Sequence, residues 1–193
     1  GCLQFPQPAP DIREYDLQYA VPRSEHTPLD VVLGIPSFGV TAIYDREAIL
    51  YRRGTHQVGK YYYHRWATNP GDMIADLLAR DFAESGVYRG VVHQRSVLAA
   101  DFELTGDVEV IEERRSGDGC VADLRLRFLL LQHSGQDAGV LLRPSFDITE
   151  PCACERPESL AAALSTALSK ASVELQTQVH QAIAAAITET PHR

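Results

Sequence analysis

The chain has 193 residues, a formal net charge of −8 and 45% hydrophobic residues, which is the composition of one globular domain with a buried core. The negative charge argues against nucleic acid and against an anionic membrane surface as a directly bound partner. No apolar run approaches the ~18 residues that are needed to span a bilayer.

The first residues predict a lipid attachment site followed by a tether. Cys2 stands where a mature bacterial lipoprotein carries its acyl groups, and the small residue Gly1 before it fits that motif or is a remnant of tag removal. The alternative is a Cys without a role near a frayed end. Residues 3–28 contain five prolines, which favour an extended chain over a packed core. We expect residues 1–12 to form the lipidated N-terminus and tether, and residues 13–189 to form a single domain.

Two strands are predicted next. Residues 13–20 alternate between apolar and polar side chains, so that Tyr15, Leu17 and Tyr19 share one face. Residues 29–35 are a nearly continuous apolar run, which is typical of a strand that is covered on both faces.

A hairpin and a helix follow, and we expect the rest of the chain to pack around them. Residues 48–51 and 58–66 predict two strands, joined by a turn at residues 54–57. A proline at the first helical position and apolar residues at helical spacing predict a helix over residues 70–85.

The strand at residues 58–66 is the candidate partner-binding surface because it is rich in aromatic residues. Residues 61–63 are three consecutive tyrosines, whose rings cannot all point to one face of a strand. If Tyr62 shares one face with Trp66, then Tyr63 shares the other face with Arg65. Exposed aromatic and arginine side chains are enriched at interface hot spots. The alternative is a covered sheet in which both sets are partly buried. The predicted contact residues, for a partner or a second copy of the chain, are Arg46, Tyr51, Arg52, Tyr63 and Arg65.

The second half of the chain predicts a short strand at residues 88–93 and then an antiparallel meander. Its strands are expected at residues 101–111, 121–131 and 140–149, each with apolar residues on one face and polar residues on the other. Opposite charges across the first two strands help to fix the register, at ~0.2–1 kcal/mol each. The expected pairs are Glu109 with Arg125 and Asp107 with Arg127.

Apolar residues recur every three or four positions through residues 158–187, which predicts a long helix. The predicted fold class is therefore α+β, a mostly antiparallel sheet with two helices packed on one face. Because the helix at residues 70–85 lies between two strands, part of the sheet can be parallel through a right-handed crossover.

Three further cysteines are Cys120, Cys152 and Cys154. A disulfide from Cys120 to either of the other two is one possibility in an oxidising compartment. The spacing of Cys152 and Cys154 is one residue short of that common in zinc sites, and no second pair of ligands lies nearby. We expect no metal.

Motifs for catalysis are weak. Residues 34–39 are one residue too long for a nucleophile elbow and are better explained as a turn after a strand. The acidic residues at 101–109 alternate along a strand, which favours a solvated face. No nucleophile stands beside a base and an orienting group, so we predict that the protein is not an enzyme and has no cofactor.

Motifs spread from Cys2 to about residue 187 resemble one protein family. They are, in order, the lipidated Cys2, Tyr15-Asp16-Leu17, Tyr44-Asp45-Arg46, Ile49-Leu50-Tyr51-Arg52, Tyr63-His64-Arg65-Trp66 and Asp101 to Gly106, followed by the long Ala/Leu helix. This pattern resembles the ABC-type transport auxiliary lipoproteins, the PqiC-like family.

The resemblance implies a fold similar to the N-terminal domain of TolB. It also implies a lipoprotein on the periplasmic face of the outer membrane, which docks on the MCE protein of an ABC-type lipid transport system. Some members form homo-oligomers. Leu3 in place of Asp after Cys2 is compatible with delivery to the outer membrane.

Three functions compete at this point. The first is a docking component that holds partner proteins. The second is a lipid-binding shuttle with a cavity between sheet and helices, which needs several hundred Å³ of space. The third is a small hydrolase tethered to a membrane. The large inward-facing residues predict a filled core, which favours the first.

Overall fold

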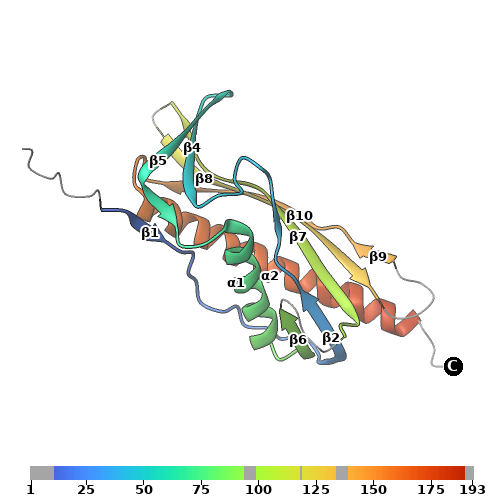
Figure 1. The fold of residues 1–193 in the computed structure, drawn as a ribbon. Coiled ribbons are helices and arrows are strands. Elements are labelled where there is room, and N and C mark those ends of the chain that lie inside the picture. Colours follow the sequence, from blue (N-terminus) through green and yellow to red (C-terminus); the bar gives the residue numbers. More distant parts are fainter. Residues whose placement is uncertain (1–10, 94–98, 118, 134–138, 190–193) are drawn as a thin grey trace, which may run out of the picture.

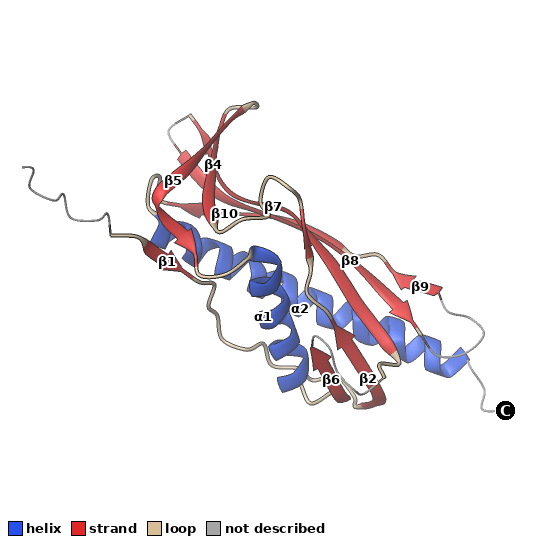
Figure 2. Cartoon of the chain, viewed as in Figure 1, coloured by secondary structure: helices blue, strands red, loops and turns tan. Residues whose placement is uncertain are grey.

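The computed structural model describes residues 11–93, 99–117, 119–133 and 139–189. They form one ten-stranded sheet and two helices, α1 (Pro70–Glu84) and α2 (Pro157–Glu189), which lie on the same side of the sheet (Figures 1 and 2). The predicted α+β class, with two helices and a mostly antiparallel sheet, is confirmed. Neither helix combines the length and the apolar character that a bilayer crossing requires. The strands are β1 (Arg13–Tyr15), β2 (Leu29–Ile35), β3 (Gly39–Val40), β4 (Ala48–Arg53), β5 (Gln57–Trp66), β6 (Tyr88–His93), β7 (Phe102–Ser116), β8 (Gly119–Gln132), β9 (Gly139–Leu142) and β10 (Ser145–Cys152).

The longest strand, β7, is the centre of the sheet. On one side, β2, β3 and β4 pair in parallel with successive parts of it. On the other side, β8 is antiparallel along its whole length, and β10 and β9 pair with the far side of β8. Beyond β4 lies β5 and then the short β1, while β6 pairs in parallel with β2 after the crossover through α1. The long antiparallel ladders and the expected parallel part therefore meet in β7.

The core lies between the sheet and α2. The apolar side chains of α2 recur on one face and are fully buried, as are the facing side chains of β7 and β8. Burying one such side chain contributes roughly 1.5–3 kcal/mol. The buried side chains with 0% exposure include Leu160, Leu164, Leu168, Leu175, Val179, Ile183, Leu104, Val108, Leu124 and Leu130.

The predicted strand at residues 13–20 is shorter than expected, because the chain leaves the sheet after Tyr15. Leu17 is nevertheless 0% exposed, and the amide N–H of Gln18 donates to Ser165 Oγ on α2 over 3.0 Å. The predicted alternation is therefore correct, but these backbone groups bond to a helix side chain where a neighbouring strand was expected.

The predicted strand at residues 140–149 is two strands, β9 and β10, separated at Pro144. The Pro144 carbonyl accepts a hydrogen bond from the Phe128 amide at 2.9 Å. Strand β10 then continues through Pro151, beyond the predicted end of the strand at residue 149. A proline is tolerated there because β10 has a neighbour only on its β8 side in the described sheet.

One predicted cross-strand pair is right and the other is wrong. Asp107 faces Arg127 as expected. An irregularity between Val108 and Val110 then shifts the register by one residue, so that Val110 faces Arg125. Glu109 instead forms an ion pair with Arg127 at 2.7 Å.

Candidate partner-binding site

The predicted contact residues lie on and next to the hairpin of β4 and β5, which rises away from the two helices (Figure 1). Tyr51 is half-buried on the side of the hairpin where the chain enters α2. The Arg115 guanidinium lies 4.0 Å from the centroid of the Tyr51 ring, and Tyr61 meets this ring edge-on at a centroid distance of 5.4 Å. Tyr51 therefore packs within the protein more than it faces solvent.

Arg52 points to the opposite side of β4. Its Nε donates to Glu112 Oε1 at 2.6 Å, and its Nη2 donates to the Tyr44 hydroxyl at 3.2 Å. Glu112 is 2% exposed, and the Tyr44 hydroxyl donates to its other oxygen at 2.7 Å. These hydrogen bonds raise the pKa of Arg52 above its ordinary value. The structure thus separates Tyr51 and Arg52, which we had grouped in one patch.

The remaining predicted residues are on the surface but do not form one cluster. Tyr63 is 54% exposed. Arg65 forms ion pairs with Glu14 and Glu47, at 2.5 and 3.4 Å. Arg46 is exposed, and its Nη2 lies 3.5 Å from the Ala42 carbonyl oxygen.

Tyr62 is the most exposed tyrosine of the hairpin, at 78%, although we had placed it on the same face as Trp66, which is 1% exposed. The cause is a register shift in β5. Lys60 faces Leu50 on β4, but the next described pair is Arg65 with Ala48. Four residues of β5 therefore oppose a single residue of β4, and strict alternation between faces fails there.

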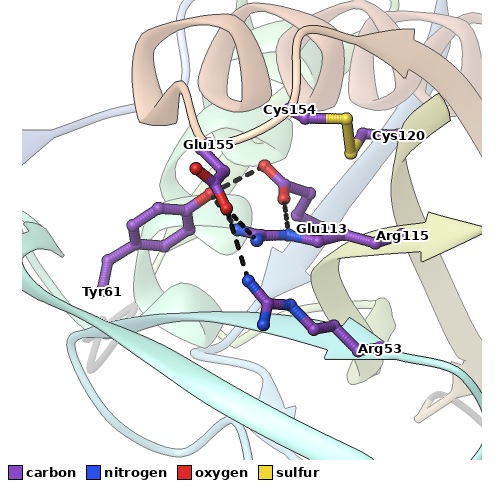
Figure 3. Close-up of polar contacts among 7 residues, drawn as sticks. All are labelled: Arg53, Tyr61, Glu113, Arg115, Cys120, Cys154 and Glu155. Atoms are coloured by element: carbon purple, nitrogen blue, oxygen red, sulfur yellow. Dashed lines mark hydrogen bonds and ion pairs between the residues drawn. A yellow bond between two sulfur atoms is a disulfide. The ribbon is translucent and has the colours of Figure 1, made fainter. Parts of the chain in front are cut away.

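A buried polar network fixes the hairpin to the body of the protein (Figure 3). Glu113 is 0% exposed and accepts hydrogen bonds from Arg115 Nε at 2.5 Å and from the Tyr61 hydroxyl at 2.8 Å. Arg115 also reaches Glu155 at 2.7 Å, and Arg53 reaches the same Glu155 oxygen at 3.3 Å. Two guanidinium groups thus balance two carboxylates. Burial and the bond to Glu113 raise the pKa of Tyr61, which keeps its hydroxyl a donor at neutral pH.

The disulfide joins Cys120 to Cys154, one of the two partners that the sequence left open. It holds the start of β8 beside Glu155 and the entry to α2 (Figure 3). Cys152 is a free thiol and faces Cys120 across the β8–β10 ladder. Burial and the nearby Glu113 raise the pKa of Cys152 to about 11, so it is protonated and unreactive at neutral pH.

In the described part of the chain, no three His, Cys, Asp or Glu residues are placed to hold a metal ion.

Two recesses of the described surface are lined mainly by polar and charged residues. One of about 570 Å³ lies on the sheet beside Arg52, Glu112, Arg114, Asp123 and Arg125. Another, of about 780 Å³, lies at the entry to α2 and includes His64, Glu155, Arg156 and Glu158. Such linings suit ions and polar side chains and do not suit acyl chains.

Sequence reasoning missed the buried carboxylates Glu112 and Glu113. A signal for them exists, because two acidic residues are followed by two arginines at the end of a strand that is otherwise apolar on one face. Alternation places Glu112 with Arg114 on one face and Glu113 with Arg115 on the other, and each face brings its own tyrosine.

The described residues thus form an α+β domain with polar networks at the base of a hairpin that exposes Tyr62 and Tyr63. The comparison with protein families then gives the family. The model of the ABC-type transport auxiliary lipoprotein component matches residues 15–176, and this chain belongs to that family. Cys2 lies outside both that match and the described residues.

Solved structures share the fold. Protein XCC0632 from Xanthomonas campestris has a TM-score of 0.81 at 23% identity, covering 92% of this chain and 99% of its own. An uncharacterized protein has a TM-score of 0.62 at 14% identity, covering 86% and 99%. The hypothetical protein CT253 from Chlamydia trachomatis has a TM-score of 0.54 at 9% identity, covering 81% and 99%. No match was found among curated proteins.

Proposed function

We propose that this protein is a lipid-anchored docking component of an ABC-type transport system of the MCE kind, which moves lipids between membranes. Acyl chains on Cys2 hold it at the periplasmic face of the outer membrane, and the domain binds the MCE protein. The observation that carries the proposal is the match of residues 15–176 to a family of transport auxiliary lipoproteins. Residues 1–12 serve as the tether and residues 13–189 as the docking domain, which also accepts a second copy of the chain.

The structure supports docking over lipid carriage. The space between α2 and the sheet is occupied by large side chains, among them Leu164, Leu168 and Phe128. A shuttle needs an apolar cavity, whereas the two recesses described above have charged linings. Exposed Tyr62 and Tyr63 give the hairpin the composition of a protein interface.

The positions of the five predicted contact residues divide them into two groups. Tyr63, Arg46 and Arg65 remain proposed contact residues, because their side chains reach the surface. Tyr51 and Arg52 act instead by holding the hairpin in place, since their partners lie inside the protein.

The test is one fractionation and purification experiment in the native host. The acylated chain should sediment with the outer membrane, and after detergent extraction it should co-purify with the MCE protein. Two or three acyl chains give stable anchoring, so Cys2→Ser should move the protein to the soluble periplasmic fraction. Cys152→Ser is the matched control and should stay with the membrane. Membrane retention of the Cys2→Ser variant contradicts the anchor, and extraction without any transporter subunit contradicts the docking role.

A further inference from the structure

Among the described residues, only a short part of the outer edge of β5 has a strand partner. Strand β5 has ten residues, and β1 pairs only with the last three of them, His64 to Trp66. In the described part of the chain, the other neighbour of β5 is β4, on the opposite side. The outer edge of residues 57–63 therefore has no strand partner among the described residues. A free edge of this length is a template for pairing with another chain.

Hydrogen bonds at the end of β5 show which amides face this edge. The Ala67 N–H donates to the Tyr15 carbonyl on the β1 side at 2.8 Å, and the Trp66 N–H donates to the Glu47 carbonyl on the β4 side at 2.7 Å. Because amides alternate along a regular strand, that of Arg65 points to the same side as that of Ala67. The edge of β5 that β1 covers therefore begins at His64, opposite Arg13, the first residue of β1.

The side chains along the edge are suited to binding. Tyr62 and Tyr63 are 78% and 54% exposed, and they flank the open backbone. Natural edges are commonly blunted by proline or several charges. Residues 57–63 contain no proline and a single charged side chain, that of Lys60.

Lys60 gives the edge one positive charge that no ion pair of the described residues balances. Residues 48–66 contain three arginines, one lysine and no acidic residue, in a chain of net charge −8. The three arginines form ion pairs with carboxylates outside the hairpin. The ion pairs of the described residues do not include Lys60, whose ammonium lies 5.4 Å from the centroid of the Tyr62 ring. A partner segment that carries Asp or Glu is therefore favoured over a neutral or basic one.

The edge is also held in advance of binding. Arg53 and Tyr61 tie the two strands of the hairpin to Glu155 and Glu113 in the body (Figure 3). A strand that is fixed before binding loses less conformational freedom when a partner pairs with it.

We propose that residues 57–63 of β5 bind an extended acidic segment of a partner protein by strand addition, with backbone hydrogen bonds to the open edge, an acidic side chain at Lys60 and the rings of Tyr62 and Tyr63 against the added strand. The identification of that partner as a transporter subunit rests on the proposed function. The mode of binding rests on the edge itself.

Amide hydrogen exchange and lysine labelling of the acylated, detergent-extracted complex test this directly. Lys60 and Lys170 are the two lysines of the chain, which makes Lys170 on α2 an internal control. In the complex, exchange at residues 57–63 should slow at least tenfold, and acetylation of Lys60 but not of Lys170 should fall several-fold. A complex that forms while residues 57–63 and Lys60 stay as reactive as in the free chain overturns strand addition and leaves the proposed function standing. Absence of any complex counts against the proposed function itself.

Two pairs of variants separate backbone pairing from side-chain contact. Tyr63→Pro removes a backbone N–H of β5 together with the ring, whereas Tyr63→Ala removes only the ring. Strand addition predicts that Tyr63→Pro weakens the complex at least tenfold more than Tyr63→Ala, and equal effects overturn it. Lys60→Glu should weaken the complex about tenfold, and Lys170→Glu should leave it unchanged. The lysine pair keeps the test decisive if Tyr63→Pro lowers the melting temperature.

A membrane or a second copy of the chain at the edge of β5 would give a different pattern of protection. Vesicles of phosphatidylglycerol that protect residues 57–63 in the Cys2→Ser variant would show a membrane contact in place of a protein strand. Protection that rises with the concentration of the free chain, together with a doubled mass in solution, would show pairing with a second copy. Either outcome overturns the proposal.

Discussion

Glu112 and Glu113 are neighbours in β7 that carry out the same task on opposite faces of the sheet. Each is buried, and each accepts one hydrogen bond from an arginine and one from a tyrosine. A buried carboxylate is costly unless all of its partners are in place, so removal of one partner is destabilising. The position of the β4–β5 hairpin therefore depends on the tyrosine hydroxyls and guanidinium groups that bind these two carboxylates.

Tyr44→Phe tests this at a single hydroxyl. The variant removes one donor to the buried Glu112 and should lower the free energy of unfolding by about 1–3 kcal/mol at pH 7, measured by urea denaturation. Tyr62→Phe is the matched control, because Tyr62 is exposed, and it should change stability by less than about 0.5 kcal/mol. Equal stability of the Tyr44→Phe variant and the native chain would show that Glu112 does not depend on this bond.

The same hydroxyl predicts part of the pH dependence. Burial and the bond to Glu112 raise the pKa of Tyr44 from 10.0 to about 12. The unfolded chain therefore loses this proton at a lower pH than the folded chain does. The stabilisation is complete below pH 10 and is lost as the pH rises towards 12. The Tyr44→Phe variant should show a smaller loss of stability over that interval than the native chain.

Single residues also mark the limit of what the sequence predicts. Arg52 was predicted to be an exposed contact residue, but alternation alone does not establish that β7 carries a buried carboxylate on each of its faces. Arg52 and Tyr61 reach Glu112 and Glu113 from β4 and β5, which are remote from β7 in sequence, so these contacts become visible only when the three strands are adjacent.

At the scale of elements, periodicity predicted α1, α2 and the β7–β8 hairpin well, because each has a continuous apolar face. It ended β7 too early, at residue 111, since the charged residues that follow it resemble a loop. Periodicity also made the first strand too long, because residues 16–20 alternate between buried and exposed side chains while they pack against helices. Such an extended segment has the same period of two as a strand in a sheet. The sequence gives no signal for the edge at residues 57–63, which has no strand partner among the described residues, because this edge depends on where β1 begins.

The connection between β8 and α2 is the element-scale feature with the largest expected effect on stability. The Cys120–Cys154 disulfide closes a loop with a sequence separation of 34 residues. A cross-link of this length contributes about 2–4 kcal/mol, mainly by restricting the unfolded chain. The Cys120→Ala/Cys154→Ala variant should lose about that much stability in urea denaturation. Addition of dithiothreitol should lower the melting temperature of the native chain and leave that of the variant unchanged.

Cys152→Ala provides the control for the disulfide, because its thiol is free and protonated. It should cost clearly less than the double variant and should keep the response to dithiothreitol. A Cys152→Ala variant that loses this response would show that Cys120 pairs with Cys152 in solution.

At the scale of the whole molecule, the segment between β1 and β2 connects the N-terminal end to both helices. Tyr19 donates to the buried Asp81 of α1 at 2.7 Å, and Ser172 of α2 donates to the same carboxylate oxygen at 2.6 Å. His26 stacks on His180 of α2 with ring centroids 4.6 Å apart. Residues that the composition assigns to an extended chain are thus part of the packed domain, and the tether must end before them.

Two truncations should locate that boundary. Removal of residues 1–10 should leave the free energy of unfolding within about 0.5 kcal/mol of that of the Cys2→Ser chain, if these residues serve as a tether. Removal of residues 1–20 also deletes Leu17, which is 0% exposed, and the Tyr19 bond to Asp81. Lost burial of roughly 2–3 kcal/mol and an under-bonded buried carboxylate at about 1–3 kcal/mol predict a total loss near 5 kcal/mol, enough to unfold many domains of this size. Equal stability of the two truncated chains, measured by urea denaturation, would place the boundary after residue 20 and make the segment a dispensable cover over the helices.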